Sequence, residues 1–393
     1  DVVSEEETPE IFTNEEQEAA GETDEDLSVF SSEEVPEFND APDEAMAAAE
    51  NAQNGVIDLI DNNNVQDGVY TISSAGDYKF TCSNRQETAN RIVIDGAAQN
   101  RINIYLNNVN INTPDDPALQ IQSSVRAQVY IYLEGINNLN SEWKAALQKD
   151  NAAKLTIDNA PNTTGELIAT SMFGAGIGGD KGNTGSNITI RGGSVTATSG
   201  SGAGIGGGQG NAGSNITISG GSVTATSTFG AGIGGGQMGT GSNITISGGS
   251  VKATSGSGAG IGGGQIGTGS NITISGGSVT ATSTFGAGIG GGSNRGTGRG
   301  ITISGGSVTA TSTFGAGIGG GNNGGTGRDI TISGGSVKAN MPGINCTPHN
   351  GSSKNVYCCI IENEHSLPVA IDSVPWNPSD HIFPDSTKDG NLY

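Results

Sequence analysis

The stretch GAGIGGGQGNAGSNITISGGSVTATS, residues 202–227, recurs along the chain and decides the fold. Its first motif, GAGIGG, begins at residues 174, 202, 230, 258, 286 and 315, so the period is 28 residues four times and 29 once. A fixed period of this length is typical of a solenoid, in which a repeat cannot bury its apolar residues alone and stacks on its neighbours.

Each period holds three short segments that are expected to form β-strands. Along every segment the apolar residues alternate with small polar ones and so point to one side; in one coil these are Ala203, Ile205, Ile216, Ile218, Val223 and Ala225. Three strands per coil, each pairing in parallel with its counterpart one period later, rise about 4.8 Å per turn and are connected right-handedly. The sequence therefore predicts an all-β, right-handed parallel β-helix.

The chain divides into four parts. Residues 171–340 hold the regular repeats, and residues 55–170 hold shorter alternating segments such as RIVID (91–95), INIYL (102–106) and VYIYL (129–133), which predict irregular coils and an N-terminal cap. Together they make about ten coils of three strands. Residues 341–393 are expected to form a C-terminal cap cut from a longer chain, because open strand edges need covering.

Residues 1–54 predict a disordered acidic linker. Of the 40 acidic residues, 19 lie within positions 1–50, where there is no Lys or Arg, so the remaining chain has 21 acids against 17 bases. The folded part thus gives no reason to expect a nucleic-acid partner. No apolar run reaches the ~18 residues of a membrane span, and the start at Asp1 suggests processing after export.

The four cysteines show no metal-ligand spacing. Three of them, Cys346, Cys358 and Cys359, lie close together, so either Cys346–Cys358 or Cys346–Cys359 is a possible disulfide, and free thiols are an equal alternative. The GxGxxG-like repeats do not predict a nucleotide site either, since no copy is followed by a helix or by Lys-Ser/Thr. We expect no metal and no cofactor.

The runs AGIGGG, NITISGG and SVTATS resemble a repeat of large exported proteins of Gram-positive bacteria. The upstream segments GVYTISSAGDYKF (68–80) and INIYLNNVNI (102–111) resemble the first half of the same proteins, which are labelled carbohydrate-binding-domain β-helices. The resemblance implies an extracellular, cell-surface or cell-wall location, recognition of a polysaccharide or of a glycoprotein glycan, and attachment to other domains of a longer protein. Some relatives bind acidic glycans through calcium, but the clustered carboxylates for this are missing here, apart from Asp115 and Asp116.

Four aromatic residues of the irregular coils are candidates for carbohydrate binding. Strand alternation points Tyr105, Tyr130 and Tyr132 outward, and alignment of Ile102 with Val129 places Tyr105 directly over Tyr132. Adjacent exposed rings would form a platform for a pyranose. The alternative is a cross-strand aromatic ladder covered by a loop. Trp143 either completes the patch or plugs a coil.

The regular coils offer less chemistry. An outward array of threonines would suit ice or sugar hydroxyls, although Lys252 and Lys338 interrupt it and strand propensity explains it as well. Outward glycines such as Gly204 are expected to leave bare backbone against a loop or a second domain, and the Phe residues before them to pack inside the corner. The asparagines of the NIT triplets are expected to form a ladder. The threonines of the array are Thr196, Thr198, Thr224, Thr226, Thr280, Thr282, Thr309 and Thr311.

A glycosidase or a lyase would need a pair of carboxylates aligned on one outward face, and the sequence shows no such pair. We therefore expect the protein not to be an enzyme. The function that the sequence favours is a non-catalytic glycan-binding or adhesion module. The alternatives are a purely structural stalk, a polysaccharide lyase-like enzyme and, as a minor one, an ice-binding protein.

Overall fold

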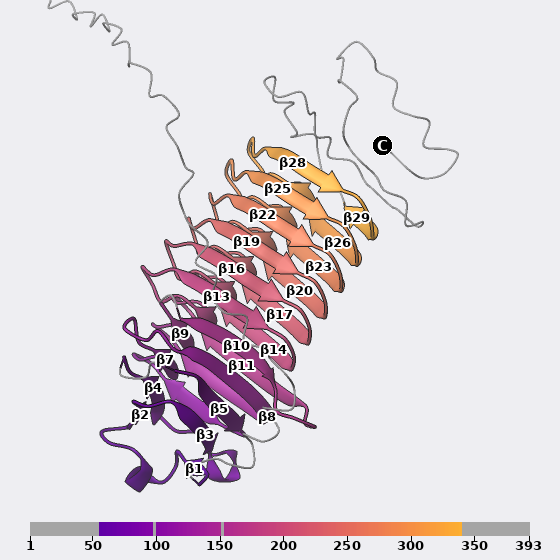
Figure 1. Cartoon of the computed structure of the whole chain (residues 1–393). Helices are drawn as coiled ribbons and strands as arrows, with labels where there is room; N and C mark the ends of the chain where they lie inside the picture. The colour runs from indigo at the N-terminus through magenta and orange to yellow at the C-terminus, as the bar shows by residue number, and fades with distance from the viewer. Residues whose placement is uncertain (1–54, 97–99, 151–152, 340–393) are drawn as a thin grey trace, which may run out of the picture. The chain divides into compact units, whose positions relative to one another are not determined.

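The structure is a computed structural model that describes residues 55–96, 100–150 and 153–339. These residues form a right-handed parallel β-solenoid, and Figure 1 shows its coils stacked from the indigo N-terminal end to the yellow last coil. The predicted parallel β-helix is thereby confirmed. The linker predicted at 1–54 and the cap predicted at 341–393, with its three cysteines, lie outside the described residues.

The first face of the solenoid is sheet A, which contains the NITI segments. Its strands pair in parallel and in register, so that Ile216 lies between Ile188 and Ile244. Its strands are β1 (Ile57–Asp58), β3 (Gly76–Thr81), β5 (Ile102–Asn107), the first half of β8 (Gln128–Ser141), β10 (Lys154–Asn159), β13 (Gly185–Ile190), β16 (Gly213–Ile218), β19 (Gly241–Ile246), β22 (Gly269–Ile274), β25 (Gly298–Ile303) and β28 (Gly327–Ile332).

The second face, sheet C, contains the SVTATS segments and follows sheet A along each coil. The long strand β8 belongs to both sheets, since its first half pairs with β5 and its second half with β6. The other strands of sheet C are β6 (Asn110–Thr113), β11 (Gly165–Ser171), β14 (Ser194–Ser199), β17 (Ser222–Ser227), β20 (Ser250–Ser255), β23 (Ser278–Ser283), β26 (Ser307–Ser312) and β29 (Ser336–Ala339).

The third face, sheet B, has ten short strands, in line with the predicted number of coils. In the regular coils each strand has two residues, Ile and Gly. The strands are β2 (Val69–Ile72), β4 (Arg91–Ile94), β7 (Leu119–Ile121), β9 (Leu147–Lys149), β12 (Ile177–Gly178), β15 (Ile205–Gly206), β18 (Ile233–Gly234), β21 (Ile261–Gly262), β24 (Ile289–Gly290) and β27 (Ile318–Gly319), and the two 3₁₀ turns are η1 (Asn62–Asn64) and η2 (Ser83–Arg85).

The core is a set of columns of small apolar side chains, as the alternation predicts. The six apolar residues named for the coil at 202–227 are all buried, and the same positions of neighbouring coils continue each column. Larger side chains fill the first coils, where the rings of Tyr70 and Phe80 meet edge to face with centroids 5.0 Å apart. Each coil buries its residues against the next, so the stack is stable as a whole.

Asparagine and glycine shape the corners. The Asn ladder is confirmed: the Nδ2 of Asn215, Asn243 and Asn271 each donates to the Oδ1 of the asparagine one coil earlier, at 3.0, 3.1 and 3.2 Å. Asn243 has a φ of 52°, in the left-handed region that Asn tolerates better than most residues.

The outward glycines were expected to leave bare backbone that packs against a loop or a second domain; the structure instead packs Gly204 against the backbone of its own and the next coil. Gly204 is buried, and a Cβ on it would lie only 2.7 Å from the carbonyl oxygen of Gly232 and 2.8 Å from the amide nitrogen of Thr226. The loop after each sheet B strand also folds back to the corner between sheets C and B. For example, the Gln209 amide donates to the Phe173 carbonyl at 3.2 Å. The glycines therefore allow backbone to pack on backbone.

Candidate functional site

The three candidate tyrosines lie together on the outer side of sheet A. Tyr105 is in register with Tyr132, as predicted, and their rings stack with centroids 4.9 Å apart. The prediction of an exposed platform is wrong, however. Tyr105, Tyr130 and Tyr132 are only 1%, 7% and 6% exposed, and with Ala160 they form a small apolar cluster separate from the main core.

Cations cover the tyrosine cluster. The guanidinium of Arg101 lies 4.0 Å from the ring centroid of Tyr130 and donates to the Tyr132 hydroxyl at 2.9 Å, while the Lys79 ammonium lies 5.4 Å from the Tyr105 ring. Burial raises the pKa of Tyr105. Because the rings are enclosed, they cannot stack on a sugar, and the cluster is the cross-strand aromatic ladder that was the alternative.

Trp143 lies apart from the tyrosines, at the corner between sheets C and B. Its side chain is 48% exposed and stacks on Phe173 of the next coil, with centroids 4.7 Å apart and planes at 10°. It therefore does not complete the tyrosine cluster. The expectation that the corner Phe residues pack inside is also wrong, because Phe229, Phe285 and Phe314 are 40%, 41% and 51% exposed.

The threonine array faces outward on sheet C. Thr196 and Thr224 pair in register, and the same column continues through Lys252, Thr280 and Thr309. The neighbouring column is unbroken over six coils, and its members are Thr170, Thr198, Thr226, Thr254, Thr282 and Thr311.

A polar pocket lies where the irregular coils meet the regular ones. It has a volume of about 410 Å³ and opens on the outer side of sheet B. All but one of its lining side chains carry an amide, a hydroxyl or a carboxylate; the residues are Gln120, Ile121, Gln122, Ser123, Ser124, Gln148, Asp150 and Asn183.

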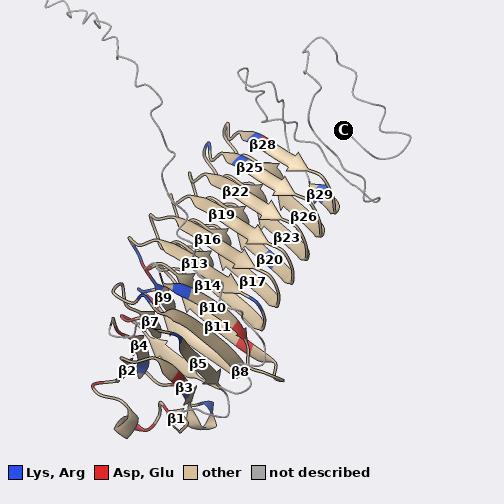
Figure 2. Cartoon of the chain, viewed as in Figure 1, with Lys and Arg blue, Asp and Glu red and all other residues tan. Residues whose placement is uncertain are grey.

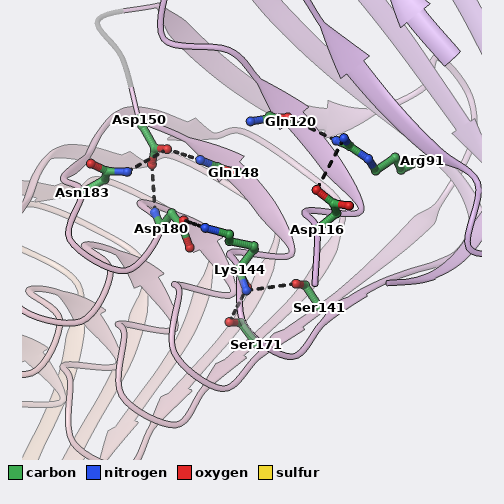
Figure 3. A network of polar contacts seen from close by, with 10 residues as sticks. All are labelled: Arg91, Asp116, Gln120, Ser141, Lys144, Gln148, Asp150, Ser171, Asp180 and Asn183. Carbon is green, nitrogen blue, oxygen red and sulfur yellow. Dashed lines mark hydrogen bonds and ion pairs between the residues drawn. The ribbon is translucent and has the colours of Figure 1, made fainter. Parts of the chain in front are cut away.

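Among the described residues that line this pocket, Asp150 is the only one with a carboxylate, and three donors hold it in place. Its Oδ1 accepts from the backbone amide of Asp180 at 2.8 Å, and its Oδ2 accepts from the amide groups of Asn183, at 3.2 Å, and of Gln148 (Figure 3). Burial raises the pKa of Asp150, the hydrogen bonds oppose this, and the charge of Asp180 adds to it. The carboxylate is thus fixed before any ligand arrives.

Two ion pairs lie next to residues that line or hold the pocket. The Lys144 ammonium lies 2.9 Å from Oδ2 of Asp180, and this hydrogen bond raises the pKa of Lys144. Arg91 donates to Oε1 of Gln120 at 3.2 Å and pairs with Asp116 at 3.5 Å (Figure 3). The charged groups belong mainly to the first coils, and Figure 2 shows few of them over the strands from β14 to β23.

Lys149 lies behind the pocket, inside the solenoid. It follows Ile94 and Ile121 in one column of sheet B, so its side chain points into the core, where it is fully buried. Burial lowers the pKa of Lys149 to about 8. Lys149 is not among the residues that line the pocket.

Sequence reasoning missed this pocket, although the sequence carries a signal for it. The segment ALQ occurs at 118–120 and at 146–148, so that glutamine takes the outward position of sheet B that glycine holds in the regular coils. Gln148 pairs with Gly178, and the change from Gln to Gly marks one side of the pocket. Asn183 lies in the loop 179–184 (GDKGNT), which aligns with GGQGNA at 207–212, so the repeat pattern also marks the position of this asparagine.

Neither a metal cluster nor a membrane-spanning helix is present in the described residues. They contain no group of three or more His, Cys, Asp or Glu side chains arranged to hold a metal ion. Within the same ranges, no helix is long and apolar enough to cross a membrane.

The fold and its repeats define the chain as a parallel β-helix repeat protein. The family model described as Beta helix repeat matches it at residues 188–209, 216–237, 244–265, 272–293, 301–322 and 330–345. The first five of these segments run from the middle of a sheet A strand through sheet C and sheet B to the following loop. No curated protein and no solved structure matches the chain.

Proposed function

We propose that the chain is a non-catalytic glycan-binding module of an extracellular or cell-surface protein, and that it binds a sugar unit in the polar pocket of sheet B. The observation that carries the proposal is the lining of this pocket, which combines amides, hydroxyls and one carboxylate in a volume of about 410 Å³. A sugar presents neighbouring hydroxyls that both donate and accept, and amide and hydroxyl side chains do the same.

The geometry of Asp150 supports sugar binding because a fixed acceptor loses little conformational entropy when it meets a ligand. The donors that hold it come from two coils, Gln148 from β9 and Asn183 from the loop after β12. The regular coils then act as the scaffold that holds this loop in position, while the irregular coils supply Gln120 and Gln122.

A catalytic role is less well supported than binding. A lyase needs a base that reaches its substrate, yet Lys149 points into the core and Lys144 is paired with Asp180. The carboxylate of Asp150 already accepts three hydrogen bonds. We therefore propose binding without bond cleavage.

Binding to a glycan panel tests the proposal. The wild-type chain is expected to bind at least one polysaccharide, and the double variant Gln120→Ala/Gln148→Ala to bind it at least about tenfold more weakly. Gln237→Ala is the matched control, since its amide belongs to the glutamine ladder of the regular loops, where Gln209 donates to it at 3.0 Å. Unchanged binding by the double variant would show that the pocket is not the glycan-binding site.

The stalk and the lyase give different results in the same experiment. A chain that binds no glycan of the panel is a structural stalk, a role to which the uniform repeats of 171–340 are well suited. Release of unsaturated or reducing sugars by the wild-type chain would contradict the non-catalytic proposal.

Ice binding is a second candidate, favoured by the unbroken threonine column from Thr170 to Thr311 on sheet C. Equally spaced hydroxyls on a flat sheet can order water. The test is thermal hysteresis of the wild-type chain, with Thr226→Lys as the variant that breaks the column. A wild-type chain without hysteresis rejects this candidate.

A further inference from the structure

The charge of the chain is divided unevenly between its parts. Although the whole sequence has a net charge of −23, residues 181–339 contain seven bases and one acid, Asp329, and so have a net charge of +6. Three of the bases are arginines of the last two coils, where Figure 2 shows blue segments on β25 and β28. We call these three residues the arginine cluster; they are Arg295, Arg299 and Arg328.

Two members of the cluster are stacked one coil apart. Arg299 and Arg328 pair in register at the start of β25 and β28, so their Cα atoms are roughly 4.8 Å apart, and both side chains are exposed. Like charges directly opposite each other destabilise a sheet, so folding does not explain the two arginines. The same column holds serine in the four preceding coils, at Ser186, Ser214, Ser242 and Ser270.

The cluster is not neutralised by the described part of the chain. Within the described residues, none of its three guanidinium groups takes part in an ion pair or in a side-chain hydrogen bond, and Asp329 is not paired with them either. Each guanidinium carries five N–H donors and a permanent positive charge. The cluster therefore offers both charge and donors to an anion.

Arg295 is placed at the same corner, between sheets B and A, by its loop. The loop 291–297 is one residue longer than its equivalent 263–268. The Arg295 amide donates to the Asn322 carbonyl of the next coil at 3.2 Å. The φ of Arg295 is 71°, in the left-handed region that is unfavourable for an L residue of this kind. Backbone strain of this sort is concentrated at functional sites.

Two threonine hydroxyls lie beside the stacked arginines. Gly298 faces the inside of its coil, because a Cβ on it would meet the Gly319 carbonyl. Alternation along the chain then turns its neighbours Thr297 and Arg299 to the outer side. The Oγ1 atoms of Thr297 and Thr326 are 3.2 Å apart, so the hydroxyls are also stacked between the two coils. The surface thus combines guanidinium and hydroxyl donors.

We propose that the arginine cluster binds a phosphate group carried by a polysaccharide, at a site separate from the pocket of sheet B. A guanidinium binds phosphate through two parallel N–H···O bonds. Arg299 and Arg328 can bind different oxygens of one tetrahedral phosphate, whose charge offsets the repulsion between them. A carboxylate has only two oxygens, in one plane, and is saturated by one such pair of bonds. Arg295 adds a third positive charge at the same corner.

Binding of the full chain to immobilised phosphomannan, measured by surface plasmon resonance, tests the proposal. We expect the wild-type chain to bind phosphomannan at least about tenfold more tightly than mannan without phosphate and than polygalacturonate. Treatment of the phosphomannan with a phosphatase distinguishes the two forms of phosphate. Binding that is lost assigns the ligand to terminal monoesters, and binding that persists assigns it to diesters within the polymer.

The decisive variant is Arg299→Ser/Arg328→Ser, which is expected to weaken binding at least about tenfold. It should fold, because serine holds this position in four other coils, and circular dichroism checks this. The matched control is Lys181→Gln/Lys252→Gln, which removes the same charge from the regular coils outside the cluster and should bind as the wild type does. Asp329→Asn should bind more tightly than the wild type.

Three results would overturn the proposal. One is a wild-type chain that does not bind phosphomannan, or that binds polygalacturonate equally well. Another is an equal loss in the two double variants, which would assign binding to the overall charge. The third is tighter binding of single-stranded DNA, which would exclude a polysaccharide as the preferred carrier of the phosphate. The pocket variant Gln120→Ala/Gln148→Ala should still bind phosphomannan, so that failure of one site is distinguished from failure of the other.

Discussion

Lys149 pairs in register with Ile121, and its fully buried ammonium takes the inward position that the isoleucine side chain holds one coil earlier. A charge in this place opposes folding, which is why burial lowers the pKa of Lys149 to about 8 from its usual 10.5. The same position explains why the lysine next to the pocket is not a candidate base.

Substitution Lys149→Met is therefore expected to stabilise the protein at neutral pH, by up to about 3 kcal/mol, because the unfavourable burial of the charge is removed. The pKa is lower in the folded state, so the unfolded chain binds more protons between pH 8 and 10.5, and wild-type stability should rise through this range. Denaturant unfolding at several pH values measures both effects. Lys252→Met, on the exposed side of sheet C, is the control and should change little; equal behaviour of the two variants would contradict the account.

The Asn ladder predicts a graded response at Asn243. Its φ of 52° and its two side-chain hydrogen bonds suit asparagine, and the equivalent residue two coils later is Gly300, with a φ of 59°. Asn243→Gly should thus cost about 1 kcal/mol for the lost bonds. Asn243→Val should cost 1–2 kcal/mol more, as an L residue resists the left-handed region. Thermal unfolding compares them, and an equal loss would show that backbone conformation is unimportant here.

Alanine substitutions at two glycines distinguish the effect of steric crowding on stability from the effect of backbone strain. Gly206 and Gly210 both have positive φ, at 134° and 88°, but only Gly206 is crowded. A Cβ there would lie 2.1 Å from the Gly234 carbonyl oxygen, whereas one on Gly210 would meet nothing within 4 Å. We expect Gly206→Ala to cost more than about 3 kcal/mol and Gly210→Ala about 1–2 kcal/mol. Denaturant unfolding measures the loss of stability in both variants, and similar losses would refute the tight packing of sheet B.

The tyrosine cluster should affect stability and not ligand binding. Tyr105→Phe removes a buried hydroxyl that has no hydrogen-bond partner within the described residues, so it should be neutral or stabilising. Tyr132→Phe loses the bond from Arg101 and should cost about 1.5–3 kcal/mol. Unfolding and glycan binding are measured for both variants. A large loss of binding with unchanged stability would restore the tyrosines as a site.

Most of the fold could be predicted because the same sequence pattern occurs six times along the chain. The alternation in residues such as Ile216 and Val223 fixes which side is buried, and the period fixes which residues stack. The register of Tyr105 with Tyr132 followed from the same alignment and is confirmed. Burial of the tyrosine cluster was harder to predict, because it depends on Arg101, whose position outside a strand follows no periodic pattern.

The pocket could be predicted less well than the fold. It depends on a loop that brings Asn183 to Asp150, two residues 33 positions apart, and on glutamines that replace glycines only in the irregular coils. The prediction that the corner phenylalanines pack inside was wrong for a different reason. A phenylalanine before a tight turn is expected to be a core residue, but Gly202 and its equivalents leave no space inside the corner. A Cβ on Gly202 would lie 2.4 Å from the Gly174 carbonyl oxygen.

The central claim is that a sugar unit binds between Gln120, Gln148, Asp150 and Asn183. A crystal structure of the full chain with an oligosaccharide taken from the binding panel tests it most directly. The account predicts a sugar ring in the sheet B pocket with a hydroxyl within hydrogen-bonding distance of the Asp150 carboxylate. A sugar bound elsewhere, for example on the threonine columns of sheet C or at the exposed phenylalanines of the corner between sheets C and B, with the pocket unchanged, would contradict it.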